Sequence, residues 1–424
     1  MPSRFVHSQI TRLLITSLAI VACVLGIWFT GRAALAQLLV RAATTFRSPP
    51  LANEAVRFNR RDAEAHYTRA ALMRASGAAP ESVAAFEQAV ALRPRDYYLW
   101  LELGMAREES GDASGALAAL NNAVQLAPYY AQPRWQRGNL LLRLNRYEEA
   151  FSDLRLAANS NPELTPSLLD LAWGLSRNDV ALAQQLAGAT SPKLQVALAL
   201  YLARRSHSEK AMEVFTSIES VPEEDRRELV KRLIAANAFD EAFRVSAVDP
   251  GSAIKGSVYD GGFEGVLSLE EAGFGWRIPR AVSAVQLSQS TEAPHSGSKS
   301  LQVDFAGQSG SDWVLLSQLV PVEPGRRYEL HFATRSRQLV TGGLPLLKVV
   351  DAANTKTLLG SSRPFGTTNE TWITDTFSFT TGPATRAVVL SLERQNCTTA
   401  PCPAYGTVWL DSLAIRQSQI QRSE

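Results

Sequence analysis

The residue types that usually do chemistry are spread through the chain at spacings that match no common catalytic motif. The five histidines lie far apart, so no two stand at the spacing of a helical zinc site. The sequence also lacks a Gly-x-Ser-x-Gly turn, a phosphate-binding glycine loop and a dinucleotide fingerprint. Adjacent acidic residues occur at 148–149, 223–225 and 270–271, and adjacent side chains on a helix point apart. We predict a protein without enzymatic activity; the alternative is a hydrolase with two carboxylates across a cleft in the C-terminal region.

Two of the three cysteines, Cys397 and Cys402, are separated by four residues, which allows a small disulfide loop. A disulfide there would place the C-terminal region in an oxidising compartment. The alternative is a pair of reduced loop cysteines. Cys23 lies inside an apolar segment, and three thiols cannot make a four-thiolate metal site.

The composition divides the 424 residues into three regions. Residues 1–50 carry five arginines and no acidic residue, and residues 51–254 are slightly acidic and rich in Ala, Leu, Glu and Arg. Residues 255–424 have no net charge and are rich in Ser, Thr, Gly and Val. With 43 basic and 41 acidic side chains in total, the chain lacks the basic excess of a nucleic-acid-binding protein. We predict an apolar basic start, a helical middle and a β-rich end.

Residues 13–31 contain no charged side chain and as a helix would span about 28 Å at roughly 1.5 Å per residue. This predicts a membrane-spanning helix within an N-terminal anchor of residues 1–40. One alternative is a cleaved signal peptide, because Ala34-Leu35-Ala36 has the form of a cleavage site. The apolar stretch is longer than the roughly 7–15 residues of a signal peptide, which favours the anchor. A buried core helix is a third interpretation.

Two features disagree on the orientation of the anchor. The arginines that follow it, from Arg41 to Arg61, favour a cytoplasmic body by the positive-inside rule. The cysteine pair favours a body in an oxidising compartment. We predict a single-pass protein of a bacterial inner membrane whose body faces the periplasm.

A regular sequence period runs through the middle region. Pro94, Pro128 and Pro162 are spaced 34 apart, and each stands where a helical pattern ends. The run from Trp100 through Leu103, Gly104, Ala116 and Ala123 to Pro128 resembles the tetratricopeptide (TPR) consensus. The resemblance implies a solenoid of paired antiparallel helices over 50–248, with three clear repeats at 63–164 and three degenerate pairs after them. The first repeat departs from the consensus, with His66 in the place of the tryptophan.

TPR proteins usually bind partners on the concave surface formed by the first helix of each repeat, so the resemblance implies a groove for a protein partner. Two register positions would line it, each recurring once per repeat. They hold Tyr67, Leu101 and Trp135 at the first, and Ala71, Met105 and Asn139 at the second. The alternative is that the large side chains pack between neighbouring repeats.

Beyond a Gly- and Ser-rich linker, the hydrophobic period changes from helical to two. Residues 327–335 alternate between apolar and polar side chains, and similar short segments follow, separated by turn clusters such as Pro324-Gly325. This pattern predicts an antiparallel β-sandwich over 256–417.

Four segments of the predicted sandwich resemble, in order, the signatures of carbohydrate-binding modules with a galactose-binding-like jelly-roll fold. They are Asp260-Gly-Gly-Phe-Glu264 with Gly275-Trp276, then His295–Leu301, Val322–Tyr328 and Val408–Leu413. The resemblance implies a jelly roll, and many members of this fold bind no sugar.

The same resemblance implies two candidate sites, although no cofactor is required. A structural calcium would be held by Glu264, a carbonyl at Lys299 and Asp411, while Ser412 replaces a second acid of the family. Glu264 and Asp411 as ordinary strand-end polar groups are the alternative. Glycan-binding candidates lie on strand faces opposite the buried side chains; they are Gln318, His331, Arg335, Glu393 and Trp409. Trp276 and Trp372 are expected to pack in the core or at an edge.

Together the three regions predict a membrane-anchored scaffold or adaptor without catalysis. Its repeats would bind a protein and its sandwich a glycan, in the export or assembly of bacterial envelope polysaccharide. The alternative is a structural subunit of a membrane complex, whose sandwich docks to protein and binds no sugar. No nucleic-acid partner is expected.

Overall fold

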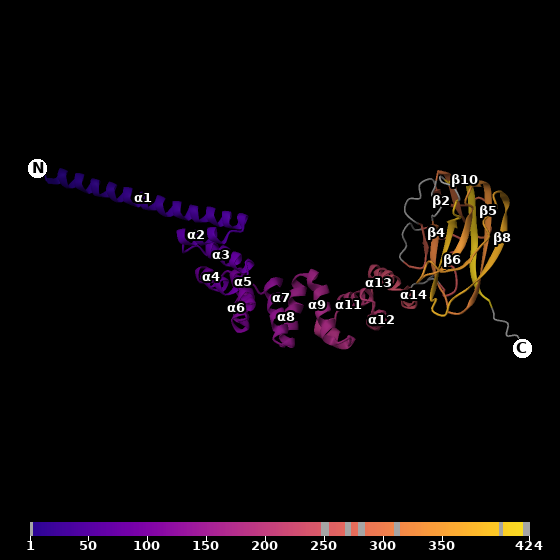
Figure 1. Cartoon of the computed structure of the whole chain (residues 1–424), viewed down its shortest axis with the longest axis horizontal. Coiled ribbons are helices and arrows are strands. Elements are labelled where there is room, and N and C mark those ends of the chain that lie inside the picture. The colour runs from indigo at the N-terminus through magenta and orange to yellow at the C-terminus, as the bar shows by residue number, and fades with distance from the viewer. Residues whose placement is uncertain are drawn as a thin grey trace. The chain divides into compact units, whose positions relative to one another are not determined.

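The computed structural model describes residues 3–246, 254–267, 273–278, 285–308, 314–397 and 402–418 (Figure 1). The predicted order of an apolar N-terminal helix, a helical-repeat region and an antiparallel β-sandwich is confirmed. By their contacts the residues form two compact units, Met1–Gly188 and Ala189–Glu424, so the last helical pairs group with the sandwich.

The helices of the first unit are α1 (Ser3–Phe46), α2 (Pro49–Phe58), α3 (Ala63–Ala75), α4 (Ala79–Leu92), α5 (Tyr97–Glu109), α6 (Ala113–Leu126), α7 (Ala131–Arg143), α8 (Tyr147–Ser160), α9 (Thr165–Ser176) and α10 (Val180–Ala187), with a short 3₁₀ turn at Pro162–Leu164. The pairs α3/α4, α5/α6 and α7/α8 follow one another at a constant interval, starting at Ala63, Tyr97 and Ala131. The first unit therefore contains TPR-like repeats, and we call α3–α10 the repeat array.

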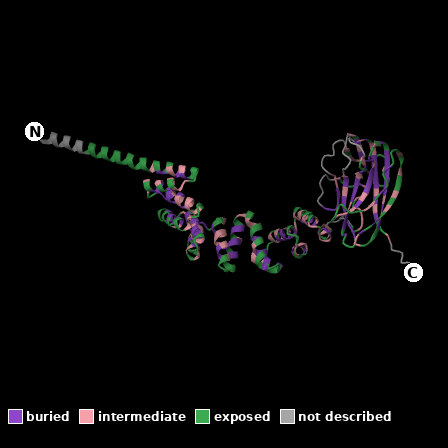
Figure 2. Ribbon diagram, viewed as in Figure 1, coloured by how far each residue is buried: buried purple, intermediate pink, exposed green. Residues whose placement is uncertain are grey.

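Within the described part of the chain, α1 is the one helix long and apolar enough to cross a membrane, over Ile15–Phe46. The large apolar residues in the first part of this segment are exposed, among them Leu18 and Phe29. Figure 2 shows most of the described length of α1 in the colour of exposed residues. Exposed apolar side chains around a helix suit a lipid environment.

Small residues let the two helices of each repeat approach closely. A Cβ atom on Gly104 would lie 2.7 Å from the Leu120 side chain, and one on Gly138 would lie 2.8 Å from the Leu154 side chain. The two glycines occupy the same register position, and so do the two leucines. The helix crossing therefore requires glycine or a comparably small residue at this position.

One side-chain bond recurs in three successive repeats with three different residue types. The indole of Trp100 donates to the carbonyl oxygen of Pro94 at 2.9 Å, and the guanidinium of Arg134 donates to that of Pro128 at 2.9 Å. His66 Nε2 lies 3.0 Å from the carbonyl oxygen of Arg60, the equivalent position. Each bond ties a first helix to the turn that ends the preceding helical pair.

The end of α1 and the whole of α2 pack like one more repeat ahead of the three. Ala36 and Ala55 are fully buried, and they lie one repeat length before Ala70 and Ala89, which hold the equivalent positions and are buried as well. Arg32 on α1 donates to the carbonyl oxygen of Phe58 at the end of α2, at 3.1 Å. By its packing, the last part of α1 therefore belongs to the helical repeats, although the sequence period was visible only from residue 63.

The second unit starts with two helical pairs. They are α11 (Pro192–Arg204) with α12 (Ser208–Thr216), and α13 (Glu223–Ala235) with α14 (Phe239–Ser246). The ring of Phe243 on α14 meets Phe274 of the sandwich edge to face at 5.5 Å. Asp240 on the same helix forms an ion pair with Lys255 at 2.7 Å. These contacts attach the last helical pair to the sandwich.

The sandwich consists of two antiparallel five-stranded sheets. The first has the order β1-β4-β9-β6-β7 and the second β2-β3-β10-β5-β8. The strands are β1 (Trp276–Arg277), β2 (Val285–Ser290), β3 (Ser300–Gln308), β4 (Val314–Pro321), β5 (Arg327–Thr341), β6 (Pro345–Asp351), β7 (Leu358–Ser361), β8 (Asn369–Thr380), β9 (Ala387–Arg394) and β10 (Pro403–Gln417). Buried apolar side chains from both sheets form the core between them. Figure 2 shows buried segments in both sheets. Trp276 belongs to this core, as expected, stacked on Phe263 at 5.1 Å.

Candidate functional site

The first helices α3, α5 and α7 carry the six residues predicted to line the groove. Leu101 is 0% exposed and packs against Leu120 and Leu140, so its prediction as a groove residue is wrong. It fills the space between the second and third repeats, because the neighbouring pair closes over this side of α5. The other five are partly exposed; they are Tyr67, Ala71, Met105, Trp135 and Asn139.

A row of tyrosines beside these positions escaped the sequence analysis. The rings of Tyr67 and Tyr98 lie 5.9 Å apart, those of Tyr98 and Tyr97 6.5 Å, and those of Tyr97 and Tyr130 5.0 Å. We call these four residues the tyrosine row. Tyr98 and Tyr130 are exposed, as is the adjacent Tyr129. The signal was present in the sequence, since a Tyr-Tyr doublet precedes or opens each of the two first helices α5 and α7.

Two hydroxyl groups of the tyrosine row meet at the surface of the repeat array. The Tyr67 and Tyr98 oxygens lie 3.4 Å apart. This hydrogen bond, with burial and the nearby Glu102 carboxylate, raises the pKa of Tyr98. The Tyr98 phenol therefore keeps its proton and can present a hydroxyl and an aromatic face to a partner.

Ion pairs connect the first helices along the same side of the array. Arg74 on α3 contacts Glu102 at 2.5 Å and Glu109 at 3.2 Å, both on α5. Glu108 on α5 contacts Arg143 on α7. The surface near the predicted groove thus combines aromatic side chains and arginines, two residue classes enriched at protein interfaces, with acidic partners of these arginines.

Three of the five predicted glycan-binding residues are not accessible. Gln318 is 1% exposed, because its amide accepts from the backbone nitrogen and donates to the backbone oxygen of Tyr259, at 3.0 and 2.8 Å. Trp409 is also 1% exposed, since the guanidinium of Arg335 covers its ring at 4.2 Å. Arg335 in turn lies between Trp409 and Trp372 and donates to the carbonyl oxygen of Glu292 at 2.9 Å. The prediction that these three bind glycan is wrong, because contacts within the sandwich occupy them.

The remaining two candidates lie on different sheets. His331 on β5 of the second sheet is partly exposed, with Nε2 3.2 Å from a carboxylate oxygen of Glu329. Glu393 on β9 belongs to the first sheet, where it lines a shallow hollow. The five predicted residues therefore do not form one site.

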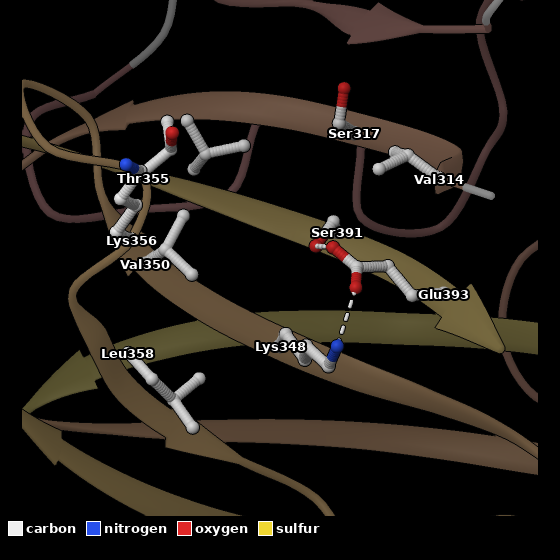
Figure 3. Close-up of a pocket in the computed structure, with 10 residues that line it drawn as sticks. Val314, Ser317, Lys348, Val350, Thr355, Lys356, Leu358, Ser391 and Glu393 are labelled. Carbon is white, nitrogen blue, oxygen red and sulfur yellow. Dashed lines mark hydrogen bonds and ion pairs between the residues drawn. The ribbon is translucent and has the colours of Figure 1, made fainter. Parts of the chain in front are cut away.

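The hollow on the first sheet has a volume of about 370 Å³ (Figure 3). It is lined by Val314, Ser317, Lys348, Val350, Thr355, Lys356, Leu358, Val389, Ser391 and Glu393. Strand register places Ser317, Ser391 and Lys348 side by side across β4, β9 and β6. Glu393 accepts from Lys348 Nζ and from Ser391 Oγ, each at 2.7 Å. The hollow thus has a polar row and a volume within the range of small-ligand sites.

The predicted calcium ligands meet hydrogen-bond donors instead. The Glu264 carboxylate accepts from the backbone nitrogens of Ser298 and Lys299 at 2.7 and 3.1 Å and from the Ser298 hydroxyl, which lowers the pKa of Glu264. Buried Asp411 accepts from the backbone nitrogens of His295 and Ser296 at 2.8 and 3.0 Å.

The Lys299 ammonium lies 3.1 Å from the carbonyl oxygen of Glu264 and supplies a cation at this place. Among the described residues, no three His, Cys, Asp or Glu side chains gather as metal ligands. These contacts favour the alternative, in which Glu264 and Asp411 are strand-end polar groups, and the calcium site stays a prediction.

The structure joins Cys397 and Cys402 in a disulfide, with the Cα atoms 6.0 Å apart. The buried guanidinium of Arg394 donates to the carbonyl oxygen of Cys402 at 3.3 Å and to the Thr341 hydroxyl at 2.6 Å. Residues 398–401 of the loop lie outside the described residues. The disulfide thus has a buried polar support from the end of β9.

Comparison with known proteins relates parts of the chain to others. No protein-family model matches it. Cellulose synthase operon protein C of Escherichia coli (strain K12) is 34% identical over 107 residues, 24% of this chain. A protein named putative cellulose synthase operon protein C, from Escherichia coli O157:H7, matches to the same extent. The chain covers 9% of the length of these curated relatives.

Solved structures are similar to parts of the chain. MamA 41-end from Desulfovibrio magneticus RS-1 covers 44% of this chain and 93% of its own, with 18% identity and a TM-score of 0.30. A structure titled "CBM4 structure and function" covers 38% of this chain and 99% of its own, with 15% identity and a TM-score of 0.30. The TPR-like helical repeat fold of the first half of the chain is seen in its own geometry, in the three helical pairs that start at Ala63, Tyr97 and Ala131.

Proposed function

We propose that this protein is a membrane-anchored scaffold of the bacterial envelope. Its repeat array binds a protein partner, and its sandwich holds a glycan during polysaccharide export or assembly. The observation that carries the proposal is the continuity of α1, which runs from an exposed apolar segment into the packed helical repeats without a break. A helix of this kind fixes a protein-binding array to a membrane.

Partner binding is assigned to the partly exposed residues of the first helices and the tyrosine row. Aromatic side chains dominate the energetics of protein interfaces, and here they stand in a row beside ion pairs of both signs. The curated relatives named for a cellulose synthase operon support a polysaccharide context. The disulfide supports a body on the periplasmic side of the inner membrane. No catalytic step is proposed.

Site-specific crosslinking in membranes tests the protein-binding role. A photoreactive residue at Met105, on the proposed binding side, should capture a defined protein. The same residue at Leu126, which is exposed on the second helix α6, serves as the control and should not capture it. Equal capture from both positions, or capture from neither, would refute the assignment of the partner to this surface.

The second candidate is a structural subunit whose sandwich docks to protein and binds no sugar. It is favoured by the burial of Gln318, Arg335 and Trp409, which removes three predicted sugar contacts. A glycan array with the full chain in detergent micelles separates the two. Binding of any saccharide supports the scaffold with a glycan site, and a complete absence of binding supports the structural subunit.

A further inference from the structure

The hollow on the first sheet carries a positive charge. Its described lining contains two lysines and one acidic residue. Lys348 and Glu393 neutralise each other in an ion pair of 2.7 Å. Lys356, exposed in the turn before β7, forms no ion pair with any described residue. One ammonium group is therefore available to a ligand.

The rest of the lining combines three hydroxyl groups with four aliphatic side chains and has no aromatic face. Ser317, Ser391 and Thr355 can each donate and accept, as the hydroxyls of a sugar do. None of the ten lining residues is Trp, Tyr or Phe, the side chains on which a neutral sugar ring would stack. The aliphatic side chains can contact the carbon faces of a sugar, but the specificity for a ligand has to come from charge and hydrogen bonds.

We propose that the hollow binds an anionic glycan, a chain of sugars that bear carboxylate groups. This inference rests on the proposed glycan-binding function and names its ligand class. A sugar carboxylate pairs with Lys356, and neighbouring hydroxyls contact Ser317, Ser391 and the Lys348–Glu393 pair. Residues 255–424 have no net charge, so attraction of an anionic polymer depends on this local ammonium group.

An acidic peptide is the rival ligand, and the backbone geometry disfavours it. Extended peptides usually gain affinity by adding a strand to a sheet edge. Most of the hollow lies over β4, β9 and β6, which have a neighbouring strand on both sides, while the edge strand β7 contributes only Leu358. Most backbone groups under the hollow therefore belong to strands that are already paired.

The test compares three probes on the full chain in detergent micelles: polygalacturonate, cellohexaose and polyglutamate. We expect polygalacturonate alone to bind. Its affinity should fall steeply between 0.1 and 1 M salt, over which the Debye length shrinks from about 10 to about 3 Å. Lys356→Met should weaken binding about tenfold, the size of one charged hydrogen bond. Lys356→Glu should weaken it further, because it adds repulsion.

The matched control is Arg416→Gln, which removes one exposed positive charge from the second sheet. This variant should leave the affinity for polygalacturonate unchanged. All variants should keep the melting temperature of the parent protein. Cellohexaose binding that Lys356→Met does not alter would overturn the inference and leave the glycan-binding function standing. Equal binding of polyglutamate would overturn it in favour of an acidic polypeptide. Failure of both glycans to bind would overturn the inference, and the glycan array described above would then decide separately on the glycan-binding function.

Discussion

The helical repeats and the sandwich use their polar side chains in different ways. In the repeats one hydrogen bond to a backbone carbonyl recurs at the same register position. His66, Trp100 and Arg134 each make it, and the carbonyl belongs to the loop that ends the preceding helical pair. In the sandwich each bond is made once, as with Gln318 on Tyr259 or Asp411 on the loop at 295–296. A repeat therefore tolerates a change of residue type where the geometry is kept, whereas the sandwich depends on individual groups.

The largest expected effect is in the sandwich, on replacing Asp411. Asp411→Ala removes a fully buried carboxylate that accepts from the backbone nitrogens of His295 and Ser296, so unfolding of the sandwich should become easier by about 3 kcal/mol, the size of two hydrogen bonds to a charged group. Chemical denaturation monitored by tryptophan fluorescence measures the change. Asp375→Ala is the control, since its partner Arg363 is exposed, and it should cost less than about 1 kcal/mol.

The same experiment checks the interpretation of the predicted calcium site. Because amides and the Lys299 ammonium occupy the site, calcium and chelator should leave the melting temperature of the parent protein unchanged. A stabilisation by calcium that Asp411→Ala abolishes would contradict this account.

The second prediction concerns Trp135, which is partly exposed in the repeat array. Trp135→Ala should weaken partner binding by about 2 kcal/mol or more if this residue is an interface hot spot. Its effect on the melting temperature should be small. Co-purification from membranes and thermal unfolding of the same variant measure both quantities. A large melting shift with unchanged partner recovery would assign Trp135 to packing, as already found for Leu101.

The third prediction compares two helical glycines of the repeat array. Gly138→Ala places a Cβ atom 2.8 Å from the Leu154 side chain, and should destabilise the array by about 1–2 kcal/mol. Gly174→Ala on α9 meets no atom within 4 Å, and should stabilise it by about 0.5–1 kcal/mol. Far-ultraviolet circular dichroism during denaturation gives both values. If both variants changed the free energy of unfolding in the same direction, the close approach of the helices would not be what determines the effect of these substitutions.

The smallest effect is a pH dependence confined to the first repeat. Burial lowers the pKa of His66 in the folded protein below its ordinary value of 6.5. At a pH between this lowered pKa and 6.5, the unfolded chain therefore binds more protons than the folded one. Stability should therefore decrease as the pH falls through 6.5. His66→Trp, which would restore the residue of the second repeat, should remove this dependence. Hydrogen exchange of α3 against pH measures it, and an unchanged profile in the variant would implicate another group.

The sequence alone predicts the register of the helices, but it does not predict which side chains are exposed on the surface. The regular period placed α3–α8 because each helix meets the same neighbours in every repeat. It could not show that Leu101 is closed off by the adjacent pair, since that depends on the facing residues of α7.

In the sandwich, strand alternation identified outward positions such as Trp409 without indicating that Arg335 would cover the ring. The hollow was missed except for Glu393, because the row of Ser317, Ser391 and Lys348 exists only through the pairing of three strands. The alternation of apolar and polar residues within one strand does not show which strands pair with it or in which register.

The uninterrupted α1 has a mechanical consequence. Fully buried Ala36 follows Gly31, the last residue of the uncharged stretch, by five positions, about 8 Å at roughly 1.5 Å per residue. A chain cut after Ala36 would lose the Arg32 bond to α2 and part of its first packed helix. In a protein anchored as proposed, any rotation of the membrane helix about its axis turns the adjoining repeats by the same angle, because no flexible linker lies between them to absorb it.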